Sequence, residues 1–212
     1  MQVLEILNLM GTLSLGNDNI KAQERAIFLQ YLNLAHFELY QETANFNQDL
    51  LVSQNIPNVP GNNYVTLASP PFLINTVYLP AIKKELKHIS VVDALKADPD
   101  SSQTGAPYGY VRRRNRVEFF PKQITAMPVT VWYIPQPSLL AENTLETDIP
   151  YPIVYHPVLA DGALYYLFQE EGGFKNAQKA NAAQDRWEAG KTKLLSYLYN
   201  SSGQRLSTFS NV

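Results

Sequence analysis

The chain contains no cysteine, which excludes disulfide bonds, thiol catalysis and cysteine-based metal sites. Charged residues are also scarce, at 17% of the chain against about a quarter in an ordinary soluble domain. Tyrosine and proline are plentiful by contrast, with 13 tyrosines and 14 prolines. Uncharged surface with aromatic residues is typical of surfaces that partners cover, because interface cores are poor in charge. The alternative is a neutral monomer surface rich in asparagine and glutamine.

Long apolar runs are missing as well. No run approaches the ~20 residues that a membrane-spanning helix needs. The N-terminal stretch has no basic region before its apolar part, and Glu5 interrupts that part. We therefore expect a short amphipathic helix over residues 2–10, ending at Gly11, and no signal peptide or membrane partner.

Patterns that carry catalysis or metal binding do not occur. The histidines, His36, His88 and His156, lie in three different segments, and no HExxH-like spacing would bring two of them to one zinc ion. Neither a phosphate-binding glycine loop nor a Gly-x-Ser-x-Gly elbow is present. We expect no enzyme, no cofactor and no metal, although sequence spacing does not exclude a hydrolase whose carboxylate pair is brought together by folding.

Charge is nearly balanced, with a net charge of −2, which argues against a chain dominated by nucleic-acid binding. One basic cluster stands out: Arg112, Arg113, Arg114 and Arg116. It either contacts phosphate or an acidic partner, or forms a solvated strand or hairpin. Nearby aromatic residues could stack on single-stranded bases, so a nucleic-acid-binding accessory protein is the alternative function.

The middle of the chain alternates in hydrophobicity and is dense in turn residues, whereas both ends have helical periodicity. We expect a helix over residues 20–45. We expect short strands over Tyr64–Leu67, Leu73–Tyr78, Ile89–Leu95, Tyr108–Val111, Arg116–Phe120 and Val129–Ile134.

Two further helices are predicted within Asp148–Tyr199. Pro157 suits a first helical position, and Gly172-Gly173 would end that helix. The second helix would begin near Phe174. Its apolar residues recur at helical spacing and form one stripe: Ala180, Ala183, Trp187, Leu194 and Leu198.

These elements predict an α+β fold, in which N- and C-terminal helices form a bundle and a small antiparallel β-sheet is inserted as a wing. The predicted domains are residues 1–50 (N-terminal helices), 51–147 (β wing), 148–199 (C-terminal helical hairpin) and 200–212 (an extended tail that binds a partner). In that polar tail, Leu206 and Phe209 are candidate anchors that become ordered on binding.

Three segments in this order resemble the head–tail connector, or adaptor, proteins of tailed bacteriophages. They are YLNLAHFEL (Tyr31–Leu39), VEFFPKQITAMPVTVWYIPQP (Val117–Pro137), and DIPYPIVYHPVLADGALYYLFQEEG (Asp148–Gly172) followed by an alanine-rich helix. The resemblance covers nearly the whole chain. The β region is longer than in the smallest adaptors, around Asn55–Tyr64 and Asp98–Tyr108.

The resemblance implies a structural virion protein that assembles in the host bacterial cytoplasm. It would form a homo-oligomeric, dodecameric ring in the neck, between the portal protein and other tail or ring proteins, and genomic DNA would pass through its channel during ejection. Such rings are closed by heterologous contacts. We expect the subunit interface to include Trp187, Ala180, Ala183, Leu206, Phe209, Glu170 and Glu171. The arginine cluster would face DNA or the portal.

Glu170 and Glu171 are candidates for a specific reason. They lie at a helix C-terminus, where the helix dipole disfavours negative charge. Pairing with a neighbour's Lys or Arg across the ring interface would explain them. Simple exposure to solvent is the alternative.

Overall fold

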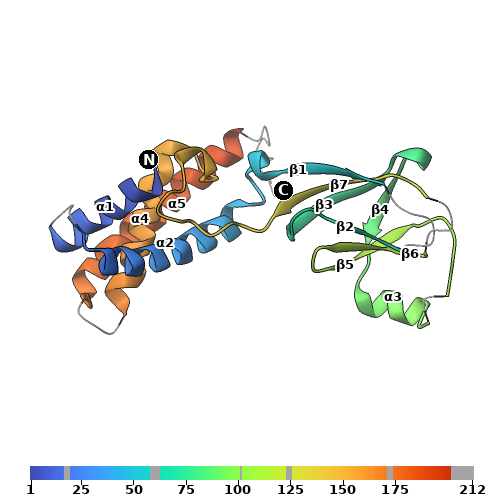
Figure 1. Cartoon of the computed structure of the whole chain (residues 1–212), viewed down its shortest axis with the longest axis horizontal. Coiled ribbons are helices and arrows are strands. Elements are labelled where there is room, and N and C mark those ends of the chain that lie inside the picture. The colour runs from blue at the N-terminus through green and yellow to red at the C-terminus, as the bar shows by residue number, and fades with distance from the viewer. Residues whose placement is uncertain (17–19, 58–62, 101, 123–125, 171–173, 202–212) are drawn as a thin grey trace, which may run out of the picture. The chain divides into compact units, whose positions relative to one another are not determined.

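The chain divides into two compact units in a computed structural model (Figure 1). The structure describes residues 1–16, 20–57, 63–100, 102–122, 126–170 and 174–201. One unit, which we call the helical unit, comprises Met1–Gln48 and Pro137–Val212. The other, the sheet unit, comprises Asp49–Gln136. Each unit has its own hydrophobic core.

The helical unit is built around one central helix. Its α-helices are α1 (Val3–Leu15), α2 (Ala22–Thr43), α4 (His156–Gln169) and α5 (Ala177–Ser201), with the short 3-10 helices η3 (Glu146–Asp148) and η4 (Ile153–Tyr155). Helix α4 packs against α1, α2 and α5, and most of its residues are buried. This explains why its sequence is apolar around much of its circumference rather than along one stripe.

Local sequence signals place the helix ends. The Glu5 carboxylate accepts a hydrogen bond from the backbone N–H of Gln2 at 3.1 Å, and Glu24 accepts one from the N–H of Lys21 at 2.8 Å. Each pair satisfies a donor at a helix N-terminus. Helix α1 ends at Gly16, whose φ of 68° is the left-handed conformation that glycine adopts readily. The predicted stop at Gly11 is therefore wrong, because Gly11 is buried within α1.

The described residues of the sheet unit form one mixed sheet of seven strands in the order β1-β7-β3-β4-β5-β6-β2. The strands are β1 (Val52–Ile56), β2 (Tyr64–Thr66), β3 (Pro71–Leu79), β4 (Lys84–His88), β5 (Gly109–Arg113), β6 (Arg116–Phe120) and β7 (Val129–Pro135). The 3-10 helices η1 (Gln48–Leu50) and η2 (Pro80–Ile82) flank strands, and helix α3 (Val91–Ala97) lies between β4 and β5. All neighbouring strands are antiparallel except β4 and β5, which are parallel.

The predicted fold class is wrong. A terminal bundle with a small antiparallel wing does not describe the chain, because the sheet has seven strands, is mixed, and includes a helix in its segment. The alternating pattern of the middle of the chain predicts a strand over Ile89–Leu95. This segment forms α3 instead, because the Ser90 hydroxyl accepts a hydrogen bond from the N–H of Asp93 at 3.0 Å and caps the helix. A parallel strand pair also needs such a crossover connection.

Strands β1 and β4 were not predicted, since their sequences, VSQNI and KELKH, have few apolar residues. The apolar stripe predicted for the last helix is confirmed: Ala180, Ala183, Trp187, Leu194 and Leu198 are all buried. That helix begins at Ala177 rather than near Phe174. The predicted joint at Gly172-Gly173 lies outside the described residues.

Candidate functional site

The basic cluster predicted from the sequence lies on a two-stranded hairpin, β5–β6, which we call the arginine hairpin (residues 109–120). Arg113 pairs with Arg116 across the strands, and Arg114 and Asn115 form the turn between them. Buried residues of the two strands, including Val111 and Val117, fix the hairpin in the core of the sheet unit. The hairpin thus presents its arginines from a rigid element.

Three of the four arginines are engaged within the sheet unit. The Arg112 guanidinium donates hydrogen bonds to two carbonyl oxygens of β3, to Phe72 through Nη1 at 2.8 Å and to Pro71 through Nη2. Arg113 forms an ion pair with Glu118, with 2.8 Å between Nε and Oε2. The Arg116 guanidinium lies 4.5 Å from the centroid of the Tyr64 ring, at cation–π distance.

Arg114 differs from the others. It is exposed, and its φ of 50° is in the left-handed region, which costs a non-glycine residue about 1–3 kcal/mol. Within the described part of the chain it makes no hydrogen bond, ion pair or ring contact. With Arg113, Asn115, Arg116 and Glu118 it lines a depression in the surface. At the tip of the hairpin, the Arg114 guanidinium, which has no partner among the described residues, therefore lies beside two guanidinium groups that are already oriented.

We expect Arg114→Gly to stabilise the sheet unit. Glycine adopts a positive φ without the steric penalty, and after its own entropic cost the gain should be about 0.5–1 kcal/mol. Urea unfolding followed by circular dichroism would measure it. The matched control is Arg113→Gly, one residue earlier in a strand, which should destabilise the unit. A loss of stability in Arg114→Gly would contradict the assigned turn strain.

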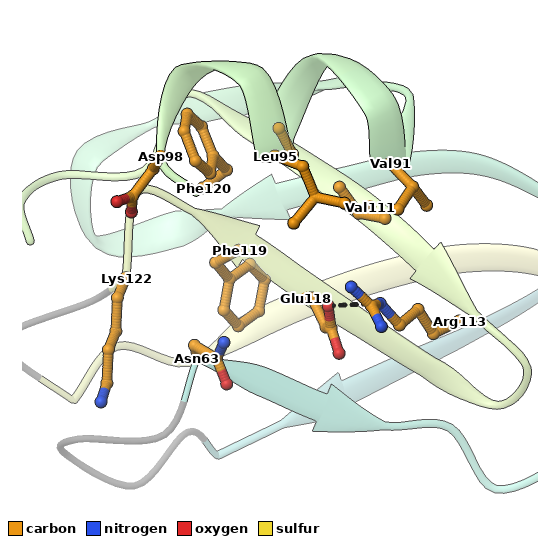
Figure 2. Close-up of a pocket in the computed structure, with 11 residues that line it drawn as sticks. Asn63, Val91, Leu95, Asp98, Val111, Arg113, Glu118, Phe119, Phe120 and Lys122 are labelled. Atoms are coloured by element: carbon orange, nitrogen blue, oxygen red, sulfur yellow. Dashed lines mark ion pairs between the residues drawn. The ribbon is translucent and has the colours of Figure 1, made fainter. Parts of the chain in front are cut away.

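A small cavity lies next to the hairpin, beneath α3. Figure 2 shows Val91 and Leu95 of α3 over Val111, with the Arg113–Glu118 ion pair at one side. The cavity volume is about 50 Å³, far below the ~300–1,000 Å³ of ordinary ligand sites. It holds water-sized molecules at most. Any partner of this region would therefore bind to its exposed surface and not inside the cavity.

The histidines have structural partners. Burial lowers the pKa of His36 to about 4, against an opposing hydrogen bond with the Ser138 backbone, so its ring is neutral at physiological pH. The ring nitrogens of His156 each lie 2.9 Å from a backbone carbonyl oxygen, of Met1 and of Tyr151. His88 packs edge-on against Tyr110. Among the described residues, no group of three or more His, Cys, Asp or Glu side chains is placed to hold a metal ion.

The other predicted site residues lie in the helical unit. Trp187, Ala180 and Ala183 are buried in its own core, and an interface role for them stays a prediction. Glu170 is exposed just after the end of α4. Glu171, Leu206 and Phe209 lie outside the described residues.

Sequence reasoning missed one polar centre in the helical unit. The Lys191 ammonium lies 3.2 Å from Glu38, 3.1 Å from Glu42 and 2.9 Å from Glu188, and we call these four residues the acidic cluster. Tyr166 donates a hydrogen bond to Glu38 as well. The signal was available, because a lysine stands at a core position of the α5 stripe, four residues after Trp187.

The helical unit thus carries a cluster of charged residues, and the sheet unit carries an arginine-rich tip. A model of a known protein family also matches nearly the whole chain. The chain belongs to the family described as SU10 adaptor protein, whose model matches residues 1–210. This membership confirms the resemblance to phage head–tail adaptor proteins.

An adaptor family implies a structural rather than an enzymatic role, contacts with other capsid or tail proteins of a phage, and a location in the virion neck. A search of curated proteins gives no match. In the described residues, no helix is both long and apolar enough to cross a membrane.

Proposed function

We propose that the chain is a ring-forming structural protein of the virion neck. Copies would assemble side by side between the portal protein and the tail and extend the channel through which the genome leaves. Family membership supports the adaptor role. Support for self-assembly comes from the surface of the helical unit.

That support is an apolar surface around the C-terminal part of α5, which we call the α5-end surface. It includes Ile153 and Val154, which are 51% and 72% exposed, and Tyr197. The rings of Tyr155 and Tyr197 lie with their centroids 5.6 Å apart. Exposed apolar residues gathered on one part of a surface are typical of protein–protein contacts.

An open groove lies on the same part of α5. It has a volume of about 320 Å³ and is lined by Phe46, Leu195, Ser196, Tyr199 and Asn200. Aromatic side chains with a polar end are enriched in interface cores. The groove and the exposed residues are both uncharged and partly aromatic, which supports the proposal that partners cover this part of the helical unit.

The proposal is tested by assembling the purified chain, alone and with the portal protein of the same phage, and measuring particle mass and shape by mass photometry and electron microscopy. We expect closed rings. Val154→Asp should weaken assembly at least about tenfold, because burying an aspartate in place of valine loses apolar burial and adds an unpaired charge.

Val92→Asp is the matched control. Val92 is 59% exposed on α3 of the sheet unit, so this variant makes the same chemical change on another surface and should assemble normally. Rings that form equally well with Val154→Asp would refute the role of the α5-end surface. A chain that stays monomeric with and without portal would refute ring formation.

The alternative, a nucleic-acid-binding accessory protein that uses the arginine cluster, has weaker support. Sequence-independent binding draws its affinity from many phosphate contacts, whereas Arg112, Arg113 and Arg116 already have partners within the sheet unit. Replacing all four arginines with alanine tests it directly: loss of a duplex DNA shift at low salt would support this function.

A further inference from the structure

The two units of the chain carry opposite charge. The sheet unit, Asp49–Gln136, has nine Lys and Arg against six Asp and Glu, a formal charge of +3. The helical unit has eight Lys and Arg against thirteen Asp and Glu, a formal charge of −5. Together they give the net charge of −2 of the whole chain. A nearly neutral protein is thus strongly polarised.

In the positive unit, Arg114 has no partner among the residues that the structure describes. Arg114 at the tip of the arginine hairpin is exposed and keeps a positive φ at a turn position that glycine or asparagine would occupy with less strain. A strained residue is grounds for asking what it does. Beside it, Arg113 is held by Glu118 and Arg116 by the Tyr64 ring, so neighbouring guanidinium groups are already oriented.

In the negative unit, one group of carboxylates carries more negative charge than the single ammonium beside it can balance. In the acidic cluster one ammonium, Lys191, faces the three carboxylates of Glu38, Glu42 and Glu188. The Lys191 side chain is only 7% exposed, whereas Glu188 is 58% and Glu42 38% exposed. Two negative charges are therefore left over, and they face solvent.

We propose that the arginine hairpin of one copy docks through Arg114 on the acidic cluster of a second copy. The inference rests on the proposed ring, in which each copy meets its neighbour through two different surfaces. Guanidinium groups pair with carboxylates in a bidentate fashion. An arginine without a partner in the described part of the chain, beside two oriented guanidinium groups, matches a small set of carboxylates better than the many phosphates of a DNA duplex.

The test is a double-mutant cycle on self-association, measured by analytical ultracentrifugation of the full chain at low and high salt. Arg114→Gln removes the charge at the tip of the hairpin. Glu42→Gln with Glu188→Gln removes the two surplus charges and leaves Lys191 paired with Glu38. Each change should weaken association about tenfold at low salt, and the combination should be no worse than either alone because it removes the same contact.

Lys84→Gln is the matched control. Lys84 is exposed on β4, away from the hairpin turn, so this variant changes the net charge by the same amount as Arg114→Gln and should leave association unchanged. Circular dichroism would check that every variant keeps its fold.

The outcomes separate this inference from the proposed ring. Rings that form normally with Arg114→Gln would overturn the docking contact and leave the ring standing. A dimer that shows the same coupled loss would support the contact and refute the ring. Three other outcomes would each overturn the docking contact. The wild-type chain could stay monomeric, or the losses of association in the single variants could simply add in the combined variant. The Arg114→Gln variant could also lose duplex DNA binding but keep self-association.

Discussion

Trp187→Ala is expected to lower the free energy of unfolding of the helical unit by about 4 kcal/mol, within the range measured for truncating large buried aromatic residues. Trp187 is 1% exposed and lies in the core formed by α1, α2, α4 and α5. Its ring packs directly on the backbone of Gly162 in α4, where a Cβ atom would lie 2.8 Å from the indole carbons Cε3 and Cζ3. Because Gly162 has no side chain, nothing on that side fills the space that truncation would leave.

Chemical denaturation followed by circular dichroism would measure the loss. Trp187→Phe is the matched control, and it should cost much less. The indole Nε1 has no hydrogen-bond partner in the part of the chain that the structure describes, so removing it sacrifices no bond, and a phenyl ring keeps most of the packing.

Gly162→Ala should itself destabilise the unit by about 1–3 kcal/mol through overcrowding. In Trp187→Ala the added methyl group has room, so the double variant should be less unstable than the sum of the two single changes. A loss below about 1 kcal/mol for Trp187→Ala, or strict additivity, would contradict the packing of Trp187 on Gly162.

The residues that the sequence located correctly are those whose signal is local. The buried stripe of α5 was predicted because its apolar residues follow the helical period from Ala180 to Leu198. Strands β6 and β7 were predicted because β-branched and aromatic residues alternate between turn residues. Gly162 gave no such signal, since its function depends on a tryptophan that lies 25 positions later in the chain.

The errors arise where tertiary structure outweighs local preference. The polar strand β4 is stabilised by pairing with β3 on one side and β5 on the other, and neither pairing can be deduced from its sequence. Helix α3 forms despite two β-branched residues at its start, because the Ser90 side chain caps it. In the candidate site, the run of arginines is visible in the sequence. The residues that each arginine contacts could not be predicted from it. The two carbonyl oxygens that accept hydrogen bonds from Arg112 belong to residues 40 and 41 positions earlier in the chain.

The position of Lys191 in the α5 stripe marks it in the sequence, but its partners on α2 could not be deduced. Lys191 carries the second large prediction. Its side chain is 7% exposed, and its ammonium contacts three carboxylates and lies 5.1 Å from the centroid of the Trp187 ring. Burial alone would lower the pKa of Lys191. The hydrogen bonds that it donates to Glu188, Glu42 and Glu38 outweigh burial and hold the pKa above its usual value.

We expect Lys191→Met to lower the free energy of unfolding by about 2–3 kcal/mol at pH 7. Removing one partner of a buried ion pair costs about 3–5 kcal/mol, and the partial exposure of the three carboxylates reduces that figure. Methionine replaces the aliphatic stem, so the loss reports on charge rather than on packing. Lys193→Met, an exposed lysine on the same helix, is the matched control and should change stability by less than about 0.5 kcal/mol.

The pH dependence gives an independent check, because a raised lysine pKa in the folded state stabilises that state wherever the unfolded chain still binds the proton. The contribution of Lys191 should therefore be complete at pH 7 and remain so up to the ordinary lysine pKa of 10.5. It should fall as the pH rises from there toward the raised value. The difference between wild type and Lys191→Met should accordingly be constant from pH 7 to 9 and shrink above pH 10.5, in denaturation curves recorded across that range. A difference that grows with alkalinity, or that is absent at pH 7, would show that the ammonium does not stabilise the helical unit.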